Sequence, residues 1–447
     1  MSTVKSDKGI ADRSMGYGLK ALNRLAGSDL LDRLKIRKQV EQLVYRSSKN
    51  GFRTATAAGR TFKKAQKLGK PARQSAGKPK GLFDVTPDDE QQMFQGAVRD
   101  FAEAKVRPAA KEADSESSVS DELLSQANEL GVNMLGVPEE LGGVMTEQSA
   151  VTTVLIGEAL AHGDMGIAYA AMAPGAVATA IGLWGSGDQE ATYLPAFTGE
   201  DIPAAALAIL EPRPLFDPLQ LETKAKKKGD EWVLTGVKSL LARPQECELF
   251  VIAADAEGIG PALFVVESGA KGLTVEDEPA MGLRPAATGR LLIDKVKLPA
   301  SALLGEENAK PKDYAACVNR SRIAWCGLAT GTAQAVLDYV IPYVNDRQAF
   351  GEPISNRQGV AFTVSDIGIE SNAMRLATYR AASRADRGES FSREAAIARK
   401  LCTTKGMQIG SDGVQLLGGH GFVKEHPVER WYRDLRAAGV MEGALLV

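Results

Sequence analysis

The chain is poor in the residues that build covalent and metal-bound frameworks. Its 447 residues include four cysteines and three histidines. The cysteines lie far apart in the sequence and make no C-x-x-C pair, so we expect reduced thiols in a cytoplasmic protein, without a disulfide framework or a zinc site. The histidines show no metal-ligand spacing, so we expect no metal centre. The low content of both residue types excludes the small disulfide-rich and zinc-stabilised classes of protein.

Long hydrophobic runs are also scarce. Residues 1–30 lack the uninterrupted apolar segment of a secretory signal. The longest uncharged stretch, 165–187, is rich in alanine and glycine and contains Pro174. A stretch that is only moderately apolar favours buried helices over a membrane span. The length of the chain predicts two to four domains or subdomains.

Acidic residues are nearly missing from the start of the chain. Residues 1–80 carry 20 Lys and Arg against 5 Asp and Glu, whereas residues 81–447 carry 34 against 51. The sequence therefore consists of a basic arm, ending in a linker at 68–80, and an acidic body. One interpretation of the arm is a solvated tail. The other is a dock for an acidic partner or for anionic lipid at the inner face of the membrane. Nucleic acid is disfavoured, because aromatic residues are sparse there and no known binding motif is present.

The acidic body begins with a helical pattern. Thr86 and Pro87 precede two aspartates and predict a helix start, because threonine caps free N–H groups and proline fits the first turn. Ser120 predicts a second helix start, and Gly131 would end that helix. The pattern continues over residues 81–203, which we expect to form an N-terminal α-helical domain.

The hydrophobic period then changes twice. Residues 204–305 contain short apolar runs bounded by glycine and charged turns, which predict an antiparallel β domain. Residues 306–447 are helical again, with long helices expected at 318–344 and 358–387. The order of helices, strands and helices predicts an α+β fold with a β domain between two helical domains.

The most specific signal is an ordered series of short motifs near the C-terminus. In chain order they are Asp346–Gly351 (DRQAFG), Arg357-Gln358, Gln415–Phe422 (QLLGGHGF) and Met441–Gly443 (MEG). Earlier segments support the series, among them Trp232–Lys238 (WVLTGVK) and Leu298–Gly305 (LPASALLG). Each motif is weak alone, but the series resembles the flavin-dependent acyl-CoA dehydrogenases over residues 82–447.

The resemblance implies a fold and a set of site residues. The fold is an N-terminal α-helical domain, a middle antiparallel β domain and a C-terminal four-helix-bundle domain. The residues that it implies are Glu442 as catalytic base, Arg322 and Gly443 at the substrate, Arg347, Phe350 and Gln358 at the FAD pyrophosphate and adenosine, and Gln415 and Gly419 at the FAD of a neighbouring subunit. A shared FAD site implies a homodimer or homotetramer. The acyl-CoA is the substrate, and electrons would leave through an electron-transfer flavoprotein.

The chemistry explains why a glutamate is needed. Desaturation of an acyl thioester removes a weakly acidic α-proton while a β-hydride leaves for the flavin. A carboxylate in a dry pocket has a raised pKa and acts as the base. Some members of the family carry the base on an earlier helix, just before an arginine. Here that position is Ser321, before Arg322, so Glu442 is the candidate base.

Three departures from the family pattern concern the flavin ring. The threonine that normally precedes Glu-Pro is Leu210, and the threonine of the usual Trp-Ile-Thr-Asn strand is Ala242. The threonine that normally follows Glu-Gly is Ala444, and the sequence stops at Val447, before the usual closing helix. We therefore expect fewer side-chain contacts to the isoalloxazine ring than the family normally makes.

These departures keep a second hypothesis open. The chain would then be a family-fold subunit that binds acyl groups or a partner protein without oxidising them. The departures favour this alternative, whereas the retained Glu442 and Arg347 favour the enzyme. Replacement of Glu442 by glutamine separates the two, because an enzyme would lose nearly all turnover.

Overall fold

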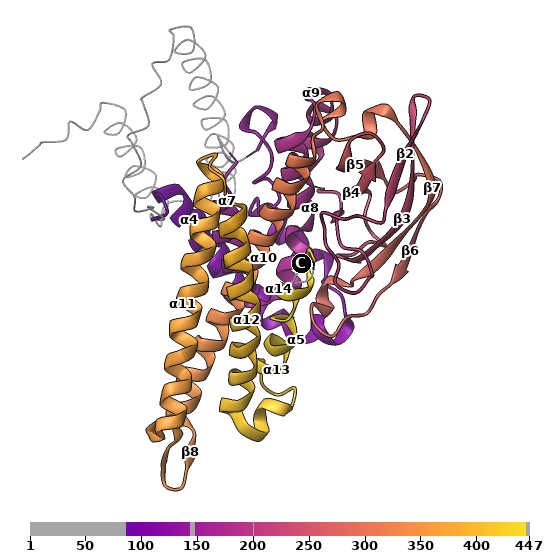
Figure 1. Cartoon of the computed structure of the whole chain (residues 1–447). Helices are drawn as coiled ribbons and strands as arrows, with labels where there is room; N and C mark the ends of the chain where they lie inside the picture. The colour runs from indigo at the N-terminus through magenta and orange to yellow at the C-terminus, as the bar shows by residue number, and fades with distance from the viewer. Residues whose placement is uncertain (1–85, 144–147, 200, 444–447) are drawn as a thin grey trace, which may run out of the picture. The chain divides into compact units, whose positions relative to one another are not determined.

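The computed structural model describes residues 86–143, 148–199 and 201–443. The chain divides into two units, Met1–Lys80 and Gly81–Val447. The predictions for the basic arm lie outside the described residues, and so does Ala444. The described residues all belong to the second unit, shown in Figure 1.

The N-terminal part of this unit is helical, as predicted. Its α-helices are α4 (Asp89–Phe101), α5 (Arg107–Glu116), α6 (Asp121–Glu129), α7 (Ala150–Gly163), α8 (Met165–Trp184) and α9 (Gly187–Tyr193). The start predicted at Thr86 is wrong by two residues. Asp88 caps α4 instead, because its carboxylate accepts the N–H of Gln91 at 2.8 Å while the Gln91 side chain accepts the N–H of Asp88 at 3.1 Å. Ser120 caps α6 as predicted.

Helices α7 and α8 form the apolar centre of this part. Both are apolar around most of their circumference, and most of their residues are buried. Among the described residues, α8 is the one helix long and apolar enough to cross a membrane, but 67% of its most apolar segment is buried inside the protein. Its position between other elements fits the buried helix expected from the sequence.

The middle region forms a seven-stranded sheet within the described residues. Its strands are β1 (Ala205–Ala208), β2 (Lys224–Lys228), β3 (Glu231–Leu241), β4 (Leu249–Ala256), β5 (Gly260–Glu267), β6 (Leu273–Asp277) and β7 (Gly289–Pro299). The order is β1-β4-β2-β3-β7-β6, with β5 paired to β4. Most pairs are antiparallel, as predicted, but β4 runs parallel to β1 and to β2. The β2–β3 hairpin lies between β1 and β4 in sequence, which provides the long connection that a parallel pair needs.

The C-terminal region contains three long helices in its described part. They are α10 (Pro311–Asp346), α11 (Gln358–Asp386) and α12 (Ser392–Leu417), followed by the short helices α13 (Val428–Asp434) and α14 (Ala437–Val440). The C-terminal region is helical, as predicted, and α7 from the N-terminal part also packs against α10 and α11. The short helices α13 and α14 pack on α12.

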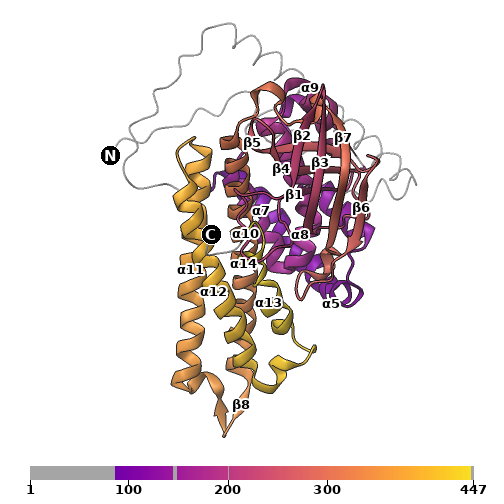
Figure 2. The same ribbon diagram turned by 45° about the vertical axis from the view of Figure 1, so that its right-hand side comes forward.

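The three regions meet around α8 and α10. Helix α8 packs against β1, and α10 packs against β5 as well as α7 and α12. Figure 2 shows the sheet on one side of these helices and α11 and α12 on the other. The turn after α14 returns the end of the described chain to this junction, so that residues distant in sequence come together there.

Candidate active site

Glu442 lies in a turn that has an unusual backbone. It follows α14, has a φ of 57°, and is followed by Gly443 with a φ of 103°. A left-handed φ is uncommon for a residue with a side chain. The conformation is held from α10, because the Arg322 guanidinium donates to the carbonyl oxygen of Glu442 from Nε at 3.1 Å and from Nη2 at 2.9 Å. From α12, Arg399 donates to the carbonyl oxygen of Gly443.

Gly443 is required by a close approach of the chain. A Cβ at this position would lie 2.7 Å from Cδ of Pro218 and 2.9 Å from the carbonyl oxygen of Phe216. The loop after β1 therefore rests directly on the backbone of Gly443. Tyr314 holds this loop in place by donating its hydroxyl to the carbonyl oxygen of Pro218 at 2.6 Å.

The carboxylate of Glu442 is buried, with 5% of the residue exposed. One oxygen, Oε1, accepts a hydrogen bond from Ser321 Oγ at 2.8 Å. The other, Oε2, is buried and has no hydrogen-bond partner among the described residues. Burial raises the pKa of Glu442, and the Ser321 hydrogen bond, Arg399, Arg322 and the Trp325 indole partly oppose this. The result is a carboxylate with one free oxygen and increased basicity.

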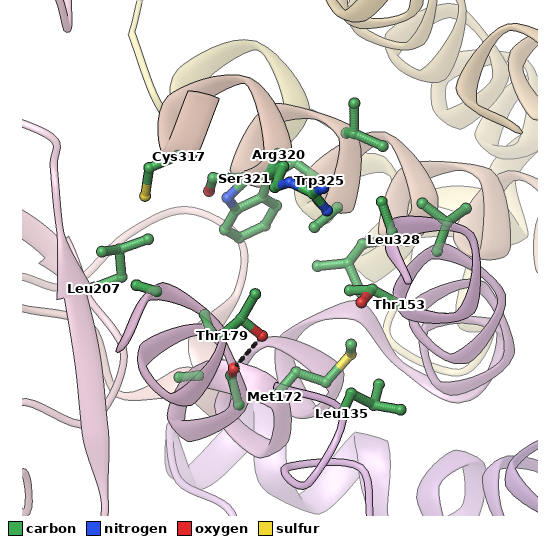
Figure 3. Close-up of a pocket in the computed structure, with 18 of the residues that line it drawn as sticks. Leu135, Thr153, Met172, Thr179, Leu207, Cys317, Arg320, Ser321, Trp325 and Leu328 are labelled. Carbon is green, nitrogen blue, oxygen red and sulfur yellow. Dashed lines mark hydrogen bonds between the residues drawn. The ribbon is translucent and has the colours of Figure 1, made fainter. Parts of the chain in front are cut away.

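This carboxylate borders an apolar cavity of about 140 Å³. The cavity lies between α7, α8, α10 and β1, and Figure 3 shows side chains from these elements around it. Most lining residues are aliphatic or aromatic; among them are Val132, Leu135, Val154, Met172, Ala173, Ala176, Leu207, Trp325 and Leu328. An apolar pocket with one convergent polar group is the usual form of a small-molecule site.

Two aromatic residues of the cavity wall were not predicted from the sequence. Trp325 and Tyr169 pack with ring centroids 4.7 Å apart and planes at 53°. The Tyr169 hydroxyl donates to the carbonyl oxygen of Leu240 at 3.0 Å, which ties α8 to the end of β3. The spacing in the sequence could have indicated Trp325. It follows Arg322 by three residues, and residues three apart lie on one face of a helix.

The positions that depart from the family pattern are buried near this junction. Leu210 is 8% exposed and Ala242 is 2% exposed. The backbone beside them is held by hydrogen bonds, and the Ser239 N–H donates to the carbonyl oxygen of Leu210 at 2.9 Å. Glu278 accepts hydrogen bonds from the Ser239 hydroxyl at 2.7 Å and from the Leu240 N–H at 2.9 Å. The strand ends are therefore rigid although they carry no threonine hydroxyl at these two positions.

A buried ion pair fixes the segment after β1. Lys238 is fully buried, and its ammonium donates to Glu211 Oε1 at 2.9 Å and to the carbonyl oxygen of Ile209 at 3.1 Å. Burial lowers the pKa of Lys238 to about 8, against the opposing effect of Glu211. Glu211 also accepts the backbone N–H groups of Glu222 and Thr223, so the loop that reaches Gly443 is anchored at both ends.

The five residues predicted to contact FAD form a separate cluster. Arg347, Phe350 and Gln358 lie at the hairpin β8 (Gln348–Ala349)–β9 (Glu352–Pro353) and the start of α11, whereas Gln415 and Gly419 lie at the end of α12. Figure 1 places β8 at the far end of the long helices from the turn after α14. The structure therefore brings Arg322, Gly443 and Glu442 together but keeps the FAD cluster away from them within one chain.

This second cluster is open. Phe350 is 94% exposed, and the Arg357 guanidinium lies over its ring at 5.3 Å. A Cβ at Gly418 or Gly419 would meet no atom within 4 Å. The Tyr343 hydroxyl lies 3.2 Å from Nδ1 of His420, which joins the end of α10 to the glycine-rich turn. Arginine and exposed backbone at one place are suited to a phosphate group.

Comparison with known proteins agrees with this arrangement. Three family descriptions match in order: the acyl-CoA dehydrogenase N-terminal domain at residues 88–201, the middle domain at 206–296 and the C-terminal domain at 314–445. The short-chain specific acyl-CoA dehydrogenase of Rattus norvegicus is 31% identical over 358 residues, covering 79% of this chain and 86% of the relative.

Solved structures show the same fold. Butyryl-CoA dehydrogenase from Megasphaera elsdenii superposes with a TM-score of 0.75 at 27% identity, covering 81% of this chain and 97% of that one. A chain in a structure described as the electron transferring flavoprotein of Acidaminococcus fermentans gives the same TM-score, identity and coverage. The chain therefore belongs to the acyl-CoA dehydrogenase family and is an FAD-dependent enzyme of that family.

Proposed function

We propose that Glu442 is the base that removes the α-proton of an acyl-CoA thioester in this enzyme. The observation that carries the proposal is the buried carboxylate, with Oε2 free beside an apolar cavity. Burial raises the pKa of Glu442, which brings its basicity closer to that of the weakly acidic carbon. Arg322 and Arg399 hold the backbone around it, so the carboxylate needs little reorganisation before it takes the proton.

The residues present fit FAD in part. The exposed arginine, glutamine and glycine groups of the cluster at β8–β9 fit a pyrophosphate and an adenosine, whereas Leu210 and Ala242 offer the ring no hydroxyl. When bound, FAD accepts the hydride that leaves the β-carbon. The apolar walls contributed by Trp325 and Tyr169 exclude water from the same space. These residues thus position an acyl group between the carboxylate and the cofactor.

A second copy of this chain is the partner we propose for the FAD cluster. The cluster is distant from Glu442 in one chain, so it would complete the site of a neighbouring subunit. Helix α11 supports this with exposed apolar residues at seven-residue intervals, Phe362, Ile369 and Leu376. Exposed apolar side chains in one line along a helix are typical of a surface that another helix covers. We therefore propose a homodimer or homotetramer.

The electron acceptor and cellular role are proposals that rest on the family. An electron-transfer flavoprotein is supported by the family and by the similar chain from the Acidaminococcus fermentans structure. The substrate class supports a role in fatty acid and lipid metabolism. We also propose a cytoplasmic location, with residues 1–80 held at an anionic membrane surface by their basic charge.

Anaerobic titration with acyl-CoAs tests the role of Glu442. The wild-type flavin spectrum should bleach, whereas Glu442→Gln should bind FAD and acyl-CoA but reduce flavin at least about 1,000-fold more slowly, because the base is missing. Glu307→Gln, on an exposed glutamate away from the cavity, is the matched control and should behave as wild type. Unchanged flavin reduction by Glu442→Gln would reject Glu442 as the base. Wild-type protein that binds FAD and acyl-CoA without any reduction would support the binding-subunit alternative, which the comparisons do not support.

A further inference from the structure

The cavity beside Glu442 has a size that limits its ligand. We infer that this site selects short acyl groups with an uncharged end, of up to about six carbons, and discriminates against longer chains. The inference rests on the proposed function for where the acyl group lies, but its basis is the shape and packing of the cavity. It names the substrate class within the acyl-CoA thioesters.

The volume gives the upper limit. The cavity measures about 140 Å³. A protein cavity of roughly 150 Å³ lined by apolar side chains accommodates benzene, which has six carbons. Since the carbonyl, α- and β-carbons must lie near Glu442, about three further carbons fill the remaining space. A dodecanoyl chain would have to displace the wall.

The wall that α8 contributes at Thr179 is closely packed and does not yield easily. On this side Thr179 of α8 lines the cavity, and its hydroxyl donates to the carbonyl oxygen of Gly175 at 2.7 Å (Figure 3). Behind it, a Cβ at Gly136 would lie 2.3 Å from the backbone nitrogen of Thr179. Asn133 adds a hydrogen bond from the N–H of Gly175 to its Oδ1 at 2.7 Å. Helix α8 therefore has no room to shift away from the cavity, because packed interiors accommodate added atoms poorly.

The apolar lining of the cavity disfavours an acyl group with a charged end. Among the described lining residues, Glu442 and Arg320 are the charged ones. Arg320 is directed to other partners: its guanidinium lies 4.0 Å from Asp386, 3.4 Å from the carbonyl oxygen of Ala385, and over the ring of Phe391. A second carboxylate on the acyl group would thus enter an apolar space without a free cation, at a high desolvation cost.

Three large side chains shape the cavity. Leu135, Met172 and Trp325 project into the cavity from the segment after α6, from α8 and from α10 (Figure 3). Trp325 is 4% exposed and packed against Tyr169, so it is a fixed wall. Met172 is the unbranched and most adaptable of the three. Truncation of Met172 should therefore lengthen the accepted chain with the least damage to the fold.

Calorimetric binding of saturated acyl-CoAs to the FAD-loaded Glu442→Gln protein tests the inference without turnover. Butyryl-, hexanoyl-, octanoyl- and dodecanoyl-CoA form the series, with glutaryl-CoA as the charged probe. Each methylene that the cavity buries should improve affinity roughly 4-fold, so hexanoyl-CoA should bind roughly 15-fold more tightly than butyryl-CoA. Octanoyl-CoA should bring no further gain, dodecanoyl-CoA should bind at least about 10-fold more weakly than hexanoyl-CoA, and glutaryl-CoA should bind more weakly than butyryl-CoA.

A pair of variants provides a second test of the size limit. Met172→Ala should improve octanoyl-CoA relative to hexanoyl-CoA by roughly 10-fold, whereas Val177→Ala, a truncation on α8 away from the cavity, should leave the ratio unchanged. Affinity that rises steadily from butyryl- to dodecanoyl-CoA in the parent protein overturns the inference, whatever the variants do. Flavin bleaching of wild-type protein, measured beside it, reports on the proposed function separately: selective binding without bleaching would retain the size limit and reject the dehydrogenase.

Discussion

The hydrogen bond from Ser321 to Glu442 makes the pH dependence of the enzyme predictable. It joins Ser321 Oγ to Oε1 at 2.8 Å and favours the ionised carboxylate, which lowers the pKa of Glu442 against the effect of burial. A hydrogen bond to a charged group is worth about 1.5–3 kcal/mol, and one pKa unit corresponds to about 1.4 kcal/mol. Ser321→Ala should therefore raise the pKa of Glu442 by about 1–2 units.

The assay is kcat/KM for acyl-CoA as a function of pH. Because the base acts only when ionised, a higher pKa moves the acidic limb of the profile to higher pH by the same about 1–2 units. The variant should be slower than wild type at low pH and approach it at high pH. Ser321→Thr, which keeps a hydroxyl, should retain the wild-type limb. A Ser321→Ala profile that superimposes on the wild-type acidic limb would refute the assignment of this hydrogen bond to the titrating base.

Three further predictions concern other parts of the molecule. Gly443→Ala should lower the unfolding free energy by about 1–3 kcal/mol and impair flavin reduction, because its Cβ would lie 2.7 Å from Pro218 Cδ at a φ of 103°; urea unfolding and anaerobic bleaching measure this, and a neutral result would contradict the close approach. Burial and Asp164 raise the pKa of Asp434 to about 8, so the folded state holds a proton that the unfolded state releases near pH 4. Stability should then fall by up to about 1.4 kcal/mol per pH unit between pH 4 and 8, and Asp434→Asn should remove this slope in unfolding measurements at pH 5 and pH 8 while still accepting the Leu283 N–H. Removal of residues 1–80 should abolish sedimentation with phosphatidylserine vesicles, and salt should weaken binding of the full chain; equal sedimentation of both would leave the arm as a solvated tail.

Much of the fold was predictable because hydrophobic period and end signals are local properties of the sequence. The capping serine at 120 and the change to short apolar runs after residue 204 needed no tertiary information. The parallel pairing of β1 with β4 was not predictable in this way, because register between distant strands depends on the connection and not on either strand. The same holds for α7, whose apolar surface does not indicate that its partner is α10.

The residues of the active site also include some that the sequence identifies and some that it does not. Glu442 was identified because a series of motifs surrounds it, and the structure adds its burial and its partners Ser321 and Arg322. Trp325 and Tyr169 were missed, because a single aromatic residue in an apolar helix is more often part of a core than of a binding site. Their role depends on a contact across 156 residues of sequence, which only the folded chain reveals.

The apolar character of α8 also has a consequence for how the chain is made. Helix α8 has almost no polar face, and part of its cover comes from β1 and α10, which follow it in the sequence. During synthesis, about 160 further residues must leave the ribosome after Trp184 before α10 is complete. Over that interval the apolar surface of α8 is exposed, because α10 is not yet available to bury it. Association with a chaperone should therefore be strongest for ribosome-bound chains that end between α8 and α10.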